Sequence, residues 1–258
     1  MLARFRTIAL SGLAAAFLAA QPAQARADEP LPRFEDPLCP GVVGLKQDAA
    51  ETVVGMIRGN AEALGLPLAS EQTCDANIVV AFIDDGADYL NRLVGQNSTL
   101  FFEMDRGERE ALLAETGGAR AVLRVRARSR DGMPIPRREN LSDIPMAEMW
   151  GAHSKIYTAT RNDILSALVL IDRGAVTGLS LQQLADYATF RALTHRLPPA
   201  SARSESIVSL FDEGAERPTG LTDFDRKFLA TLYDGLPNLP GSARLAALEA
   251  ATGAPFTE

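Results

Sequence analysis

The segment that most constrains the fold covers residues 181–197, LQQLADYATFRALTHRL. At 100° per residue, its apolar side chains fall on two opposite sides of a helix, with Leu184 and Ala188 on one side and Phe190 on the other. A helix with two apolar sides has to be covered on both, so we expect it between a sheet and a second layer. Ser180 is the expected N-cap.

Four other segments have strand patterns. Residues 76–84 are rich in β-branched side chains and predict a buried strand, and the alternation in residues 154–161 and the apolar residues 163–172 predict two more. In residues 121–130, apolar side chains alternate with arginines, which predicts one buried face and one charged face.

Helical spacing predicts a helix over residues 44–65, two short helices over 88–94 and 105–115, a helix after the N-cap Thr222, and a short last helix over 242–251. Together with the strands, these elements predict an α+β fold, a mixed β-sheet packed by helices.

The first 25 residues have the pattern of a cleavable signal peptide. Arg4 and Arg6 precede an apolar stretch over residues 8–20, and Ala23 and Ala25 fit the small-residue rule for cleavage. The apolar stretch is shorter than the roughly 20 residues that a bilayer-spanning helix needs. We therefore expect cleavage after Ala25, no membrane span in the mature chain, and a periplasmic or secreted location.

The remaining residues, 26–258, are expected to form a single domain. The formal charge of the whole chain is −7, and loss of the two leader arginines makes it −9. This acidic balance argues against general binding to nucleic acid or to anionic membranes.

Cys39 and Cys74 are the only cysteines in the chain. An exported protein meets an oxidising environment, so we expect these two residues to form a structural disulfide. The alternative, a metal site or a reactive thiol, has no nearby histidine to support it.

The arginine-lined strand has two interpretations. Arg124, Arg126, Arg128 and Arg130 could bind an anionic polymer or an acidic partner protein. They could also protect an edge strand against pairing with another sheet. The abundance of carboxylates in the chain favours the second interpretation.

The order of four segments, ALVLID, RALTHRL, SIVSLF and LTDFDRKFLATLY, resembles the zincin metallopeptidases of matrixin type, and proteins of unknown function that share their frame. The resemblance covers roughly residues 154–235. It implies a zincin-like C-terminal half, in which the helix would carry H-E-x-x-H and a Met-turn would follow.

Aligning the helix with that motif places Tyr187 and Arg191 at the two metal-binding histidines, Ala188 at the catalytic glutamate and Leu197 at the third ligand. Val208 stands at the Met-turn methionine. Because arginine is always cationic and repels a metal ion, the sequence predicts no metal, no cofactor and no catalytic residue here.

The sequence therefore predicts an exported, catalytically inactive metallopeptidase-like protein that serves as a binding or structural module. Tyr187, Arg191 and His195 are the candidate binding residues in the former cleft, and an envelope protein or peptide is the expected partner. The alternative for Tyr187 and Arg191 is a packed tyrosine and a buried ion pair. The alternative function is a peptidase with an unorthodox metal site.

Overall fold

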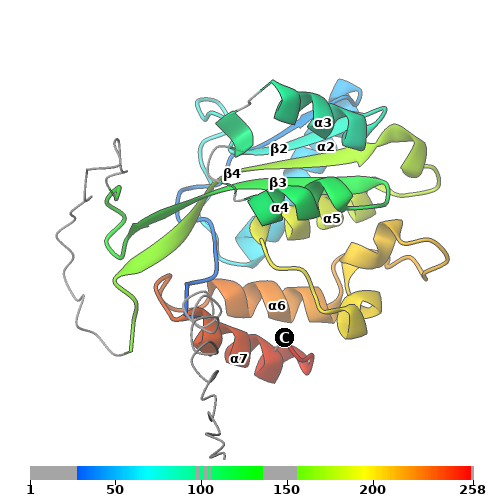
Figure 1. The fold of residues 1–258 in the computed structure, drawn as a ribbon. Helices are drawn as coiled ribbons and strands as arrows, with labels where there is room; N and C mark the ends of the chain where they lie inside the picture. Colours follow the sequence, from blue (N-terminus) through cyan, green and yellow to red (C-terminus); the bar gives the residue numbers. More distant parts are fainter. Residues whose placement is uncertain (1–27, 97–98, 102–103, 105, 136–155, 257–258) are drawn as a thin grey trace, which may run out of the picture.

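The computed structural model describes residues 28–96, 99–101, 104, 106–135 and 156–256. The expected leader, and much of the proline-containing loop that follows residue 131, lie outside the described residues. The structure has a four-stranded sheet with helices on both faces, and it confirms the α+β class (Figure 1). The elements are β1 (Pro40–Val43), α2 (Gln47–Ala63), β2 (Ile78–Ile83), α3 (Gly86–Gly95), η1 (Thr99–Phe101), α4 (Arg106–Ala114), β3 (Ala119–Ser129), β4 (Thr160–Asp172), η2 (Arg173–Ala175), α5 (Leu181–Leu193), η3 (Ala200–Glu205), η4 (Ile207–Phe211), α6 (Asp223–Tyr233) and α7 (Gly241–Thr252).

The strand order in the sheet is β1-β2-β4-β3. β1, β2 and β4 run parallel to one another, while β3 pairs antiparallel with β4 and forms one edge. This arrangement confirms that the arginine-lined segment is an edge strand. β1, which lies directly after the proline-rich N-terminal segment, was not predicted.

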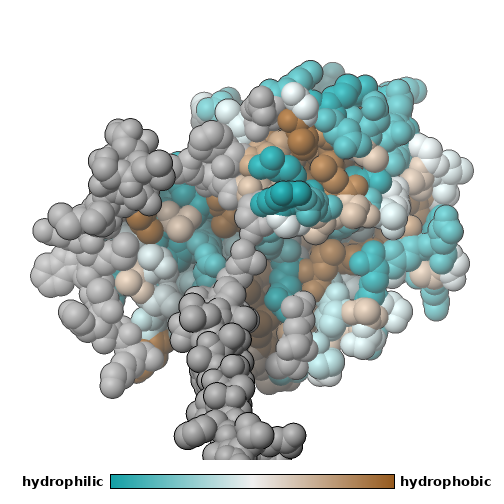
Figure 2. All heavy atoms as spheres, viewed as in Figure 1, coloured by the Kyte–Doolittle hydropathy of each residue, from teal (hydrophilic) through white to brown (hydrophobic). Residues whose placement is uncertain are grey.

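Each face of the sheet packs against its own set of helices. The larger core lies between the sheet and α2 and α5, and a smaller core lies under α3 and α4. α6 and α7 form a further layer on the side of α5 away from the sheet (Figure 1). The surface over α4 is hydrophilic (Figure 2), as expected of a short helix that buries only Leu112.

The strand predicted over residues 163–172 is confirmed, but it is not separate from the strand predicted over 154–161, of which residues 154–155 lie outside the described residues. β4 is continuous from Thr160 to Asp172, and its polar residues Asn162 and Asp163 are buried within it. The Asn162 amide donates to the Pro30 carbonyl, and the Arg161 guanidinium donates to the Asp163 carboxylate at 3.0 Å. These partners satisfy polar side chains that would otherwise interrupt a strand.

The predicted helix caps are confirmed. Ser180 begins α5 with a capping box closed by Gln183, and Thr222 begins α6 with a capping box closed by Asp225. α5 ends earlier than expected, at Leu193, because Thr194 is already extended and two prolines follow at 198 and 199.

The disulfide between Cys39 and Cys74 is confirmed, with the two Cα atoms 6.1 Å apart. Each cysteine lies shortly before a strand, so the bond joins the starts of the parallel neighbours β1 and β2. A disulfide persists in oxidising compartments, which fits an exported protein. No helix among the described residues is long and apolar enough to cross a membrane.

Removal of this disulfide should reduce stability. The bond closes a loop with a sequence separation of 35 residues, for which loop-closure entropy predicts about 4 kcal/mol. We expect the double variant Cys39→Ala with Cys74→Ala to lose about 2–4 kcal/mol in urea unfolding. The reduced wild-type chain is the matched control and should lose a similar amount. An unchanged unfolding midpoint in both would show that β1 and β2 do not need the cross-link.

Candidate functional site

α5 positions the residues that the sequence analysis selected. All ten residues from Leu184 to Leu193 are buried, including the polar Asp186, Thr189 and Arg191. The Asp186 carboxylate accepts hydrogen bonds from the side-chain amide of Asn60 on α2 at 2.7 Å and from the Leu221 N–H at 2.8 Å. These contacts fix the rotation of α5 relative to its neighbours, because a buried carboxylate without partners is strongly unfavourable.

Tyr187 and Arg191 face one pocket of about 400 Å³, the α5 pocket. Leu197 and Val208 line the same pocket, although they follow the helix by several residues. The structure thus brings together the four positions that the metallopeptidase motif assigns to its three metal ligands and its Met-turn methionine. Ala188, at the position of the motif's glutamate, is fully buried.

Arg191 forms a buried ion pair in this pocket. Its guanidinium donates to the Glu115 carboxylate at 2.7 Å and to the Tyr187 hydroxyl at 3.0 Å. Glu115 directly follows α4, so this bond crosses from the helix layer of one face of the sheet to that of the other. The arrangement is the packed tyrosine and buried ion pair that the sequence analysis gave as the alternative to a binding role.

The protonation states of the pocket follow from burial and charge. Burial raises the pKa of the Tyr187 phenol, which therefore stays neutral. Burial opposes the charge of Arg191, but the Glu115 carboxylate and the hydrogen bonds to Glu115 and Tyr187 raise the pKa of the guanidinium above its usual value. The pocket therefore holds a permanent cation at Arg191, which the resemblance to metallopeptidases would align with a metal-binding histidine.

A metal ion does not fit this set of side chains. Tyr187 is a neutral phenol, Arg191 is a cation and Leu197 has no donor atom, whereas zinc requires thiolate, imidazole or carboxylate ligands. Elsewhere in the part of the chain that the structure describes, no three His, Cys, Asp or Glu side chains come together as a metal site would require.

A second ion pair lies at the same pocket. The Arg203 guanidinium donates to both carboxylate oxygens of Asp212, at 2.6 and 2.8 Å. Both residues line the α5 pocket, and the aromatic ring of Phe211 packs edge-on against Tyr187 with centroids 4.7 Å apart. Sequence reasoning missed Glu115, Arg203 and Asp212, since none belongs to a motif.

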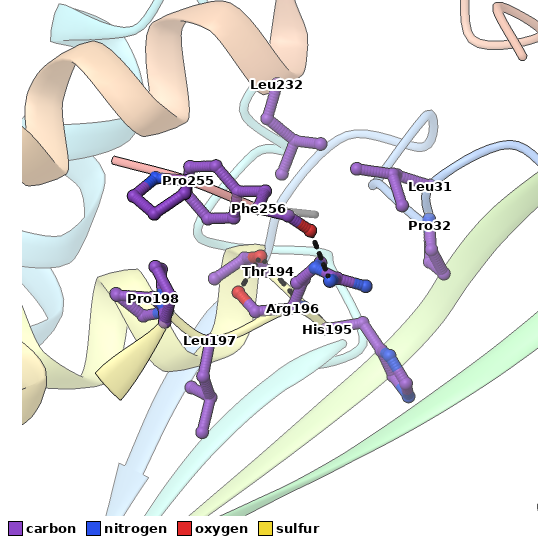
Figure 3. Close-up of a pocket in the computed structure, with 11 residues that line it drawn as sticks. Leu31, Pro32, Thr194, His195, Arg196, Leu197, Pro198, Leu232, Pro255 and Phe256 are labelled. Atoms are coloured by element: carbon purple, nitrogen blue, oxygen red, sulfur yellow. Dashed lines mark hydrogen bonds between the residues drawn. The ribbon is translucent and has the colours of Figure 1, made fainter. Parts of the chain in front are cut away.

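His195 lies apart from Tyr187 and Arg191. It is exposed after the end of α5 and does not line the α5 pocket. It borders a small pocket of about 400 Å³ built largely from prolines and Phe256, where the Arg196 guanidinium donates to the Phe256 carbonyl at 3.0 Å (Figure 3). In this view the His195 ring points away from Phe256 (Figure 3).

His195 also borders a larger groove of about 870 Å³ along β3, the edge groove. One wall comes from Leu31, Pro32, His195 and Arg196, and the other from Leu100, Met104 and Glu108. The backbone of β3 from Leu123 to Ala127 lies between them. The groove therefore follows the outer edge of β3, which Pro134 pairs at Arg128.

The register shows which backbone groups of β3 face this groove. At the two ends of the strand, the Gly118 carbonyl and the Arg130 N–H bond to the β4 side, so even-numbered residues face β4. The odd-numbered Leu123, Val125 and Ala127 therefore direct their N–H and C=O groups away from β4. No hydrogen bond from another described residue satisfies these groups.

Neither the protein-family models nor the curated proteins nor the solved structures contain a match to this chain.

Removing the carboxylate from the α5 pocket should destabilise the fold. We expect Glu115→Gln to lower the free energy of unfolding by about 1–3 kcal/mol, because the Arg191 charge would stay buried without its counter-charge. Glu110→Gln on the same helix is the matched control. It removes an exposed pair with Arg106 and should cost less than about 1 kcal/mol. If both variants lost the same free energy of unfolding in urea, the Arg191–Glu115 pair would stabilise the fold no more than an exposed ion pair does.

Proposed function

We propose that this chain is an exported, non-catalytic binding module on a metallopeptidase-like frame, which holds an extended peptide segment of an envelope partner in the edge groove. The observation that carries this proposal is the content of the α5 pocket. The helix positions 187 and 191 and the later positions 197 and 208 converge there, as metal ligands and a supporting methionine would, but an arginine paired with Glu115 fills the site.

The ion pair between Arg191 and Glu115 supports a protein that has kept the fold of a metallopeptidase but has lost its zinc-dependent catalysis. Zinc peptidases need two imidazoles one helical turn apart, a third ligand and a carboxylate that takes the proton of the bound water. Here the cation that the pocket holds is part of the protein. Its counter-ion Glu115 comes from a distant segment, so the pocket is stabilised as a packed interior and not as an open ligand position.

The edge groove supports the binding role. Leu123, Val125 and Ala127 direct away from β4 N–H and C=O groups that no described residue pairs, at the alternating spacing that a neighbouring strand requires. An extended peptide can add to such an edge with main-chain hydrogen bonds, while side-chain contacts on both sides give specificity. The apolar Leu31, Leu100 and Met104 in the two walls offer such contacts.

The frame can be tested by restoring the ligands. We expect a triple variant, Tyr187→His with Arg191→His and Leu197→His, to bind close to one zinc ion per chain, because the three positions face one pocket. The wild-type protein, purified from the periplasm without chelators or a histidine tag, should contain close to none. Metal content is measured by mass spectrometry.

Two results would contradict the proposal that the chain has a metallopeptidase-like fold without its metal ligands. One zinc ion per wild-type chain would reveal a ligand set in the native protein. A folded triple variant, verified by circular dichroism, that still binds no zinc would mean that the three positions do not converge as ligands.

Strand addition can be tested separately with Val125→Pro. Proline removes the N–H that points into the groove, whereas the ladder to β4 uses the even-numbered neighbours and remains. We expect at least a tenfold loss, equivalent to about 1.4 kcal/mol, in the affinity for a fluorescent peptide of alternating valine and glutamate, measured by polarisation.

The control for Val125→Pro uses the unchanged protein and a modified peptide. The same peptide with N-methylated backbone amides should bind the wild-type chain equally poorly, whether or not Val125→Pro folds normally. Full affinity for the methylated peptide would rule out strand addition.

A further inference from the structure

The edge groove has a charge pattern that selects the peptide. We propose that the groove takes an acidic extended segment with carboxylates at alternating positions, and that Arg124 is the residue that recognises them. This inference rests on the proposed binding function and names the chemical class of the partner.

Arg124 is distinguished by its lack of internal partners. It is half-buried, lines the groove, and makes no hydrogen bond or ion pair with any residue in the part of the chain that the structure describes. Other arginines of the same strand are engaged. Arg120 lies 3.7 Å from Asp172, and Arg128 lies 3.5 Å from the buried Asp163. A half-buried guanidinium without a counter-charge is a ready partner for a carboxylate from outside.

The geometry of the strand fixes where that carboxylate would lie. Even-numbered side chains of β3 point to the α4 side of the sheet, while Leu123 and Val125 pack into the larger core on the α5 side. In a strand added to the edge, the residues opposite Arg124 and Arg126 point to the same face as these arginines. An acidic residue opposite Arg124 would therefore meet its guanidinium, and further acidic residues two positions away would point to the same face.

The balance of charge in the groove agrees with this assignment. Among the described residues that line the groove are Arg124 and the carboxylate Glu29, which accepts a hydrogen bond from Asn162 and not from Arg124. The chain as a whole has a formal charge of −7. In a protein with a net negative charge, a half-buried guanidinium with no counter-charge among the described residues attracts an anionic group locally, while the rest of the surface repels it.

The test compares two fluorescent seven-residue peptides, one alternating valine and glutamate and the other alternating valine and glutamine. Wild-type protein should bind the glutamate peptide about tenfold more tightly at low salt, and added salt should shrink this preference. Arg124→Gln should remove most of the preference. Arg217→Gln is the matched control, because Arg217 is exposed and lies outside the groove, and it should leave the preference intact.

A charge reversal makes the assignment specific. Arg124→Glu should bind a peptide of alternating valine and lysine more tightly than the glutamate peptide, which a change in stability alone would not produce. Equal affinity of the wild-type chain for the glutamate and glutamine peptides would overturn the acidic specificity and leave strand addition standing.

Binding of neither peptide would overturn the proposed function itself. Equally tight binding of dextran sulfate, lost in Arg124→Gln, would identify a polyanion surface and overturn peptide recognition.

Discussion

The burial of α5 is the constraint on which the rest of the structure depends. A helix with ten consecutive buried residues needs cover on every side, and the sheet, α2, α6 and the η4 segment provide it. Three of the ten residues are polar, and each needs a partner in the interior. Thr189 donates to the carbonyl one turn earlier, but Asp186 and Arg191 reach across to Asn60 and Glu115. Through these bonds, α2 and the end of α4 are held in register with α5.

The same constraint explains why the α5 pocket is closed to a cation. A buried ion pair adds little net stability compared with a well-packed apolar pair, but loss of one partner is costly. Arg191 and Glu115 are thus bound to one another, and a metal ion would have to displace a permanent charge. Along β3, no described residue pairs with the Arg124 guanidinium or with the outward backbone groups of Leu123, Val125 and Ala127. Any recognition by this face of the molecule therefore falls to the groove.

Local signals in the sequence predicted much of the fold. The caps at Ser180 and Thr222, the burial of α5, the pairing of the cysteines and the edge position of the arginine-lined strand all follow from patterns within short segments. The continuity of β4 could not be predicted in this way. Asn162 and Asp163 look like a break, and only their contacts with Pro30 and with neighbouring arginines make them compatible with a strand.

Local sequence patterns also predicted one part of the candidate site and not the other. The helical spacing predicted that Tyr187 and Arg191 share a face, and they do. It could not identify Glu115, which is 76 residues away in sequence. It also grouped His195 with them, whereas α5 has already ended and the chain has turned toward the groove. A helical pattern predicts which residues share a face only as far as the helix continues.

The open edge of β3 is itself informative, because an unpaired strand edge invites association with other chains. The arginines of β3 are one protection against this, since charged side chains disfavour pairing with a second copy of the same strand. Such protection does not require a free guanidinium in a walled groove. Arg120 and Arg128 are paired with Asp172 and Asp163, whereas Arg124 has no counter-charge among the described residues. A strand that repels its own copy through unpaired positive charge accepts a strand of opposite charge, so one arrangement of side chains both prevents self-association and selects a partner.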